Sequence, residues 1–112
     1  MTALRLLKRV RLMNNRRVDF ARIADAALAN ADTIVSRWCP DGKRVGAEWI
    51  ARNPRRHDNR LGSFKINLVT GAWADFSESS RGGDFISLAA YLFGTSQKEA
   101  AINIAKMLGL ST

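Results

Sequence analysis

Residues 53–84 read NPRRHDNRLGSFKINLVTGAWADFSESSRGGD, and this stretch decides the fold of the chain. It contains two short runs rich in apolar and aromatic residues, 63–68 and 72–76, which are separated by Thr70-Gly71. Two such runs joined by a glycine-containing turn are typical of a β-hairpin. The stretch ends at Asp84, whose carboxylate can accept hydrogen bonds from the first turn of a helix, so we expect a helix to begin there.

The residues after this stretch predict two helices. Residues 84–93 are apolar on most sides, which indicates a buried helix that ends at Gly94. Ser96 and Glu99 have the spacing of a capping box, so a second helix begins there and ends at the C-cap glycine Gly109. Its buried face is expected to consist of Ala101, Ile104, Ala105 and Leu108.

The segment before this stretch predicts a helical region and a further strand. Apolar residues recur at helical spacing over 19–38, with a break around Asn30, and Pro40 and Gly42 then favour a turn. We interpret 48–52 as a strand that pairs with the hairpin. The predicted fold class is therefore α+β: a small antiparallel sheet of about three strands, packed by helices on its N- and C-terminal sides.

Length and composition favour one domain with a polyanionic partner. The 112 residues are enough for one hydrophobic core, and we divide them into a basic N-terminal segment, 1–17, and a single domain, 18–112. The first segment is expected to be a disordered tail, with a short basic amphipathic helix as the alternative. A net charge of +8 favours nucleic acid through counterion release, although a basic surface also serves solubility alone.

The chain shows no sign of membrane insertion or of secretion. No run approaches the ~20 apolar residues of a membrane span, and the basic N-terminal segment lacks the apolar core of a signal peptide. The single cysteine, Cys39, cannot form an internal disulfide. The simplest location is therefore a reducing cytoplasm.

The residue types argue against an enzyme. One cysteine and one histidine cannot build a Cys/His zinc site, and nothing in the sequence ties His57 to a nucleophile. The acids Asp75, Glu78 and Asp84 leave a Mg²⁺ or Ca²⁺ site open, as in a metal-dependent nuclease, because such ions bind converging oxygen ligands. The interpretation that we prefer assigns no catalytic residue, no metal ligand and no cofactor to the chain.

Basic and aromatic residues around the hairpin predict a nucleic-acid interface. A cationic groove with aromatic faces binds single strands through phosphates and stacked bases. Alternation along the first strand places Phe64 in the core and Lys65 on the outer face. Gly82-Gly83 before a helix would add an anion contact. Trp73 is the stacking candidate, although aromatic residues of small sheets are more often core. The predicted nucleic-acid-binding residues are Arg52, Arg55, Arg56, Arg60, Lys65, Trp73 and Arg81.

At these residues the chain resembles the N-terminal zinc-ribbon domain of bacterial and phage DNA primases, in a form without zinc. The resemblance covers about residues 45–110 and extends to zinc-less segments of primase–helicase-like proteins from phages and mobile elements. It rests on the order of Asn53-Pro54, Ser63-Phe64, Thr70-Gly71, Asp75-Phe76 and Gly82-Gly83-Asp84-Phe85-Ile86.

The metal-ligand positions of that family hold other residues here. Asn53 replaces the first cysteine, Arg56 or His57 stands near the histidine position, and Asp75 and Glu78 fall at the second cysteine pair. An amide and two carboxylates do not suit structural zinc, so the resemblance implies a fold held by apolar packing and by arginine–carboxylate pairs. The expected pairs join Asp75 or Glu78 to Arg55 or Arg56, and metal binding by these acids stays open.

In that family this domain binds the single-stranded template, helps to choose where primers start, and does not itself polymerise. The resemblance therefore implies a non-catalytic single-stranded DNA-binding module in DNA replication or mobile-element maintenance, with a replicative helicase or a primase catalytic domain as further partners. The alternative is a protein-interaction module that docks onto a helicase, polymerase or host factor through an exposed apolar patch on the last two helices. The sequence leaves open whether the nucleic acid is DNA or RNA, and whether the chain is part of a larger primase–helicase.

Overall fold

The computed structural model describes residues 18–55 and 63–111. The predicted N-terminal segment, together with Arg56, His57 and Arg60, lies outside the described residues. The described elements are, in chain order, α2 (Phe20–Ala29), α3 (Ala31–Trp38), β1 (Lys43–Val45), β2 (Glu48–Ala51), β3 (Phe64–Asn67), β4 (Trp73–Asp75), β5 (Ser80–Gly82), α4 (Phe85–Phe93) and α5 (Gln97–Leu108). The predicted α+β class, with helices before and after an antiparallel sheet, is confirmed.

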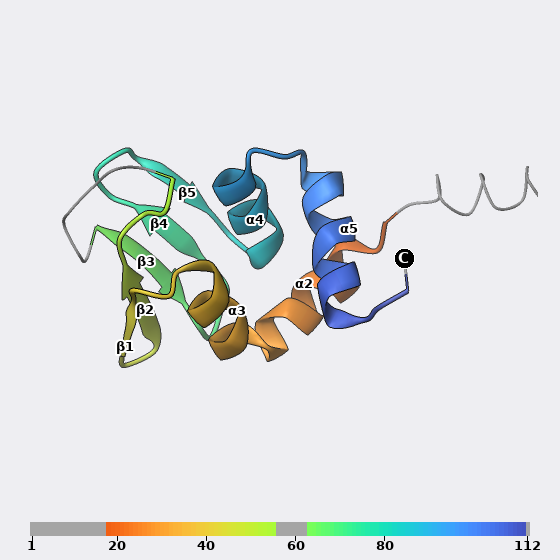
Figure 1. Cartoon of the computed structure of the whole chain (residues 1–112), viewed down its shortest axis with the longest axis horizontal. Helices are drawn as coiled ribbons and strands as arrows, with labels where there is room; N and C mark the ends of the chain where they lie inside the picture. The colour runs from red at the N-terminus through yellow and green to blue at the C-terminus, as the bar shows by residue number, and fades with distance from the viewer. Residues whose placement is uncertain (1–17, 56–62, 112) are drawn as a thin grey trace, which may run out of the picture.

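Among the described residues, five strands form one antiparallel sheet in the order β1-β2-β3-β4-β5 (Figure 1). The predicted hairpin is β3 and β4, in which Phe64 pairs with Asp75. Gly71 has a φ of 83° in the connection between them, a conformation that glycine adopts without the steric cost of a Cβ atom. The strand predicted at 48–52 is β2, and it pairs with β3.

The sequence predicts about three strands, whereas the sheet has five. The two additional strands, β1 and β5, were not predicted because their residue types carry little strand signal. β5 is Ser80-Arg81-Gly82, whose residue types prefer turns, and it forms because β4 offers an edge on which Ala74 pairs with Arg81. β1 pairs with β2 across a tight turn at Gly46. The segment between the predicted hairpin and α4 therefore contains a short strand.

The helices begin and end at the predicted residues. The break at Asn30 separates α2 from α3. At the start of α4, Asp84 accepts a hydrogen bond from Ser87 N at 2.8 Å, and Ser87 Oγ lies 3.4 Å from Asp84 N, so the two residues form a capping box. Gly94 and Gly109 end α4 and α5 in the left-handed conformation.

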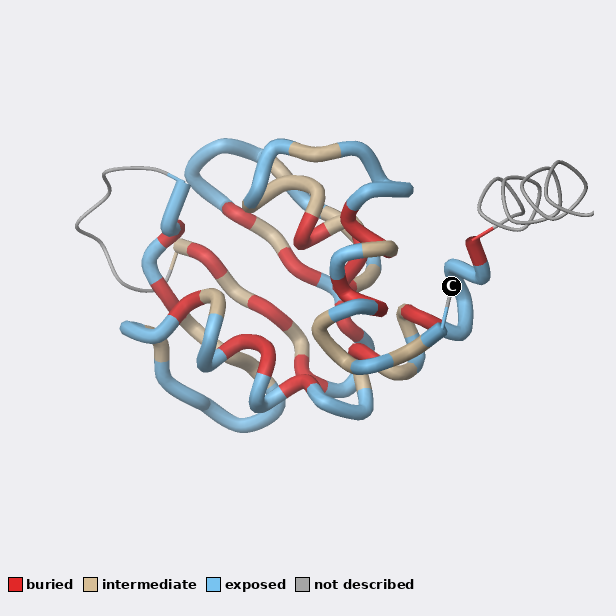
Figure 2. The backbone as a smooth tube through the Cα atoms, turned by 45° about the vertical axis from the view of Figure 1, so that its right-hand side comes forward, coloured by how far each residue is buried: buried red, intermediate tan, exposed pale blue. Residues whose placement is uncertain are grey.

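The helices lie on one side of the sheet, and the core lies between the two layers (Figure 1). Figure 2 shows buried and less buried positions alternating along the strands, while most connecting loops are exposed. α4 packs against both α2 and α5. None of the described helices is long and apolar enough to cross a membrane. The largest apolar side chains that are less than 2% exposed are Phe64, Phe85, Ile23, Ile34, Ile66, Ile86, Leu88 and Ile104, so the prediction that Phe64 is core is confirmed.

Candidate functional site

The face of the sheet turned away from the helices, here called the open face, carries the strand residues that alternate with the core. The registers of the four strand pairs place one residue from each strand in a single row across it. Because side chains alternate along a strand, Arg52 and Phe76 continue the same side just beyond the ends of β2 and β4. The row consists of Lys43, Ile50, Lys65, Ala74 and Arg81.

Three of the five residues in this row are cationic and none is acidic. Lys43, Lys65 and Arg81 stand on β1, β3 and β5, that is, on every second strand. Since neighbouring strands lie roughly 5 Å apart, consecutive cations are separated by about 10 Å. Lys43 and Arg81 are exposed and Lys65 is half-buried. The open face therefore presents a line of positive charge across the sheet.

Phe76 is the exposed aromatic residue beside this line. Its side chain is 67% exposed, and Lys65 Nζ lies 5.7 Å from the centre of its ring, which is a cation–π arrangement. A pocket of about 390 Å³ adjoins it and is also lined by Ala74 and Arg81. An exposed ring next to cations can stack a base while the cations neutralise the neighbouring phosphates.

Trp73, the predicted stacking residue, is buried, and that prediction is wrong. Its side chain is 5% exposed, and its ring centre lies 4.8 Å from that of Tyr91 and 6.1 Å from that of Phe64. Its Nε1 donates a hydrogen bond to Ser87 Oγ at 3.0 Å. Trp73 and Asp75 lie on the same side of β4 and both are buried, which shows that this side of the strand faces the helices. The ring offers no free face to a base.

The anion contact predicted at Gly82-Gly83 stays a prediction, and the structure gives Gly82 a packing role. Gly82 belongs to β5, and a Cβ atom there would lie 2.3 Å from Ser87 Oγ and 2.5 Å from Trp73 Nε1. The glycine is therefore required by close packing. The negative charge that the N-terminus of α4 favours is supplied by the chain itself, through the Asp84 carboxylate.

The predicted arginines divide between two sides of the sheet. Arg52 and Arg81 are exposed on the open face or at its margin. Arg55 is also exposed, but its Nη1 donates to Tyr91 O at 3.0 Å and its guanidinium carbon lies 4.9 Å from the centre of the Tyr91 ring. Tyr91 itself packs against Trp73 on the helix side. Lys65, Arg52 and Arg81 thus lie on the same side of the sheet, whereas Arg55 contacts Tyr91 on the helix side. Arg56 and Arg60 lie outside the described residues.

A cluster of polar side chains, here called the polar cluster, includes three residues at positions that correspond to zinc ligands in the resemblance, namely Asn53, Asp75 and Glu78. It consists of Asn53, Asp75, Glu78 and Tyr91. Asn53 and Asp75 are 1% and 0% exposed. Asn53 Nδ2 donates to Asp75 Oδ2 at 2.6 Å and to Tyr91 Oη at 2.7 Å, and its Oδ1 accepts from Arg55 N at 2.8 Å. All hydrogen-bonding groups of this buried amide are therefore engaged within the protein.

The remaining contacts of the polar cluster satisfy its two acids. Tyr91 Oη donates to Glu78 Oε2 at 2.5 Å, and Asp75 Oδ1 accepts from Ser77 N at 3.0 Å and from Ser77 Oγ at 2.8 Å. Burial and the hydrogen bond to Glu78 raise the pKa of Tyr91 above its ordinary value. The phenol therefore stays protonated near neutral pH and remains a donor to Glu78.

The residues of the polar cluster do not fit zinc. Structural zinc prefers thiolate and imidazole ligands, whereas Asn53 directs amide hydrogens at Asp75 and Tyr91. The predicted pairs join Asp75 or Glu78 to Arg55 or Arg56. Arg55 instead contacts Tyr91, and Arg56 lies outside the described residues. Within the described ranges no three His, Cys, Asp or Glu side chains converge, so the acids of the alternative nuclease reading do not form a shared cation site.

Comparison with known proteins shows a similar fold in a solved structure. No family model matches the chain, and no curated protein matches it in sequence. The crystal structure of the Aquifex aeolicus primase, containing its zinc-binding and RNA polymerase domains, is similar with a TM-score of 0.69 and 20% sequence identity. The match covers 86% of this chain and 23% of the primase chain, so this chain spans less than a quarter of that protein. At this level of identity the likeness shows a shared fold.

Proposed function

We propose that this chain is a non-catalytic module that binds single-stranded DNA, related to the template-recognition domain of primases and acting in DNA replication or mobile-element maintenance. The observation that carries the proposal is the open face, where Lys43, Lys65 and Arg81 line up beside the exposed ring of Phe76. The fold shared with a primase structure and the primase zinc-ribbon resemblance of residues 45–110 support the same direction.

The chemistry of binding follows from the geometry of the open face. Lys65 and Arg81 neutralise backbone phosphates, and Phe76 stacks one base, a contact worth about 1–3 kcal/mol. Only unpaired bases present a face to such a ring, so single strands bind better than duplex. None of these contacts reads a base edge, and the module therefore discriminates little between sequences.

The proposed module binds template but does not polymerise, and its proposed partners follow from this. A module that only holds template must deliver it to other proteins, and a primase catalytic domain or a replicative helicase is the partner that this role requires. The structural likeness to a chain that contains both a zinc-binding and an RNA polymerase domain is consistent with such an arrangement.

The test is a titration of labelled single-stranded and duplex oligonucleotides, followed by fluorescence anisotropy at several salt concentrations. We expect tighter binding of single strands, an affinity that falls with salt, and loss of affinity in Lys65→Ala with Arg81→Ala. Lys98→Ala is a suitable control, because Lys98 is exposed on α5 and lies outside the open face. Little quenching of tryptophan fluorescence is expected, since Trp73 is buried. Binding that is absent, or equally weakened by the control, would refute the proposal.

A further inference from the structure

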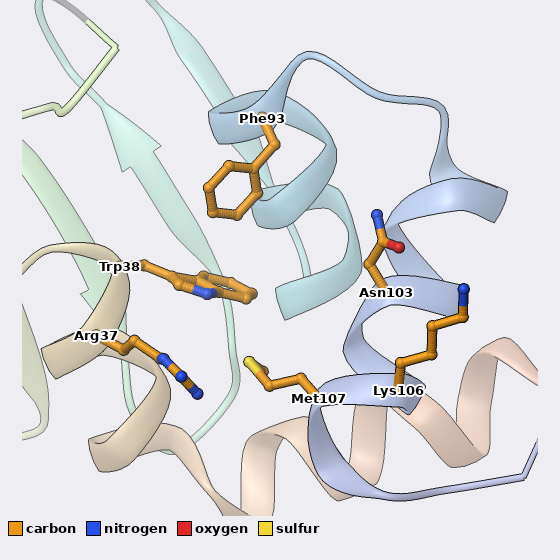
Figure 3. Close-up of a pocket in the computed structure, with 6 residues that line it drawn as sticks. All are labelled: Arg37, Trp38, Phe93, Asn103, Lys106 and Met107. Carbon is orange, nitrogen blue, oxygen red and sulfur yellow. The ribbon is translucent and has the colours of Figure 1, made fainter.

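A groove of about 710 Å³ lies between α3, α4 and α5, on the helix side of the molecule (Figure 3). The open face lies on the other side of the sheet, so the groove is separate from the proposed DNA site. The groove is lined by Arg37, Trp38, Phe93, Asn103, Lys106 and Met107.

The base of the groove is aromatic and apolar. Trp38 and Phe93 meet edge to face, with ring centres 5.6 Å apart, and Met107 extends toward them from α5 (Figure 3). Phe93 is 59% exposed, although it is the last residue of an otherwise well-buried helix. Covering such a ring is favourable by about 25 cal/mol for each Å² of apolar surface removed from water. The groove therefore favours an apolar occupant.

The groove adjoins a smaller pocket of about 90 Å³, and the two share Trp38, Phe93, Asn103 and Met107. This volume is far below that of pockets for drug-sized ligands, which begin near ~300 Å³, and it suits a single side chain. Thr95 also lines the pocket, and its Oγ1 is the buried side-chain polar atom without a hydrogen-bond partner among the described residues. That hydroxyl is available to a polar group that accompanies the apolar side chain.

The rim of the groove is positively charged. Arg37 and Lys106 are exposed on either side of it, and none of its six described lining residues is acidic. The acid of α3, Asp32, pairs with Arg44 at 3.3 Å. Residues 2–17 of the chain contain six basic residues and no acid, so their charge matches that of the rim instead of complementing it. Charge complementarity therefore requires an acidic occupant from another molecule.

We propose that this groove binds a short acidic peptide segment of a partner protein. One large apolar side chain of the peptide enters the small pocket, and acidic residues beside it pair with Arg37 and Lys106. A nucleobase suits the small pocket poorly, because most of its lining is apolar and the polar edges of a base would lose their partners there. With the two sites on opposite sides of the sheet, the module can hold DNA and a protein at once.

The test is a selection of displayed random dodecapeptides on the full chain, followed by anisotropy with the enriched peptides. The expected peptides carry an aromatic or large aliphatic residue next to two or more acids. Lys106→Glu is expected to weaken their binding by about tenfold, which is about 1.4 kcal/mol. Lys98→Glu is the matched control, because it makes the same charge change on the same helix about 12 Å away along the helix axis. Phe93→Ser, at an exposed position, tests the apolar contact.

Each other outcome would overturn the proposal. Failure to enrich acidic peptides with an apolar anchor, or equal effects of Lys106→Glu and Lys98→Glu, would show that the groove does not read this chemistry. Loss of single-stranded DNA binding in Lys106→Glu and Phe93→Ser would make the groove a nucleic-acid site. Sedimentation that shows a dimer abolished by the same variants would make a second copy the occupant. Because Lys65→Ala with Arg81→Ala tests only the open face, the two proposals can fail separately.

Discussion

Asp75 and Phe76 are consecutive in the chain, yet they belong to the two contrasting regions of the molecule, the polar cluster and the open face. Asp75 is fully buried, and its oxygens accept hydrogen bonds from Asn53 and Ser77. Phe76 is 67% exposed and its ring lies beside Lys65. In the polar cluster the partners come from the same chain, whereas the open face directs charge and a ring toward solvent. Neighbouring residues can thus serve stability and binding separately, because successive side chains of a strand point in opposite directions.

Each hydrogen bond of the polar cluster is weaker than a structural metal site. A hydrogen bond to a charged group contributes about 1.5–3 kcal/mol, whereas a structural zinc contributes about 10–16 kcal/mol. No single bond of Asn53 or Asp75 therefore matches a metal, and apolar packing must supply much of the stability. The strands β1 and β5, and the packing of α4 against α2 and α5, enlarge that contribution.

Asp75→Ala is the substitution with the largest expected effect, and it acts on stability. It removes the acceptor for the buried Asn53 amide and for Ser77 N, and leaving such groups unsatisfied should lower the free energy of unfolding by about 3 kcal/mol. Phe76→Ala next to it should change this free energy by less than about 0.5 kcal/mol. Urea unfolding followed by circular dichroism measures both. Similar losses in the two variants would remove the distinction between the two regions.

Phe76→Ala should have its effect on DNA instead. We expect the affinity for single-stranded DNA to fall by about thirtyfold, or about 2 kcal/mol, because one stacking face is lost. Phe76→Tyr keeps the ring and should restore most of the affinity, and anisotropy titrations of all three proteins test this. An alanine variant with full affinity would exclude the ring from the site.

Lys65→Ala and Arg81→Ala should each have a smaller effect, visible mainly in the salt dependence. If each residue neutralises one phosphate, the slope of log affinity against log salt should become shallower by about 0.7 per substitution. The free energy of unfolding should stay nearly constant, because Arg81 is exposed and Lys65 only half-buried. An unchanged slope in the double variant would mean that the line of charge does not contact the strand.

Arg55→Ala should affect stability more than DNA binding, although Arg55 was predicted from the sequence to bind phosphate. Its contacts with the Tyr91 ring and carbonyl indicate a loss of about 1 kcal/mol in the free energy of unfolding. Its DNA affinity should fall less than that of Arg81→Ala. The reverse pattern, with stable protein and weak binding, would assign Arg55 to the DNA site despite its contact with Tyr91.

The smallest effect on the free energy of unfolding near neutral pH is expected from the Cys39 thiol and the Tyr91 phenol. Burial, with a further contribution from Asp41, raises the pKa of Cys39 from 9.0 to about 12, and burial with Glu78 raises that of Tyr91. Both groups favour the protonated form in the folded state, so their stabilising contribution is complete below pH 9 and is lost as the pH rises toward 12. Unfolding experiments from pH 7 to 11 should show stability falling only above pH 9. A smaller decline is expected in Cys39→Ala, and an identical decline would exclude this thiol.

The helix ends and the central hairpin could be predicted from local sequence patterns. Asp84 and Gly109 cap their helices as predicted, and Ser96 Oγ accepts from Glu99 N at 3.1 Å. These features depend on residues within a few positions of one another, so the local pattern is enough to predict them. The core position of Phe64 could likewise be predicted from alternation along its own strand.

Only the tertiary structure decided which residues face solvent, and so which belong to the candidate site. Extending the alternation to β4 would have placed Trp73 and Phe76 on opposite faces of the sheet. Which of the two is buried depends on the face that the helices cover. β5 and the hydrogen bonds of Asn53 also depend on contacts between residues far apart in the chain. The physical reason is that caps and turns are local, whereas burial and strand pairing are properties of the assembled layers.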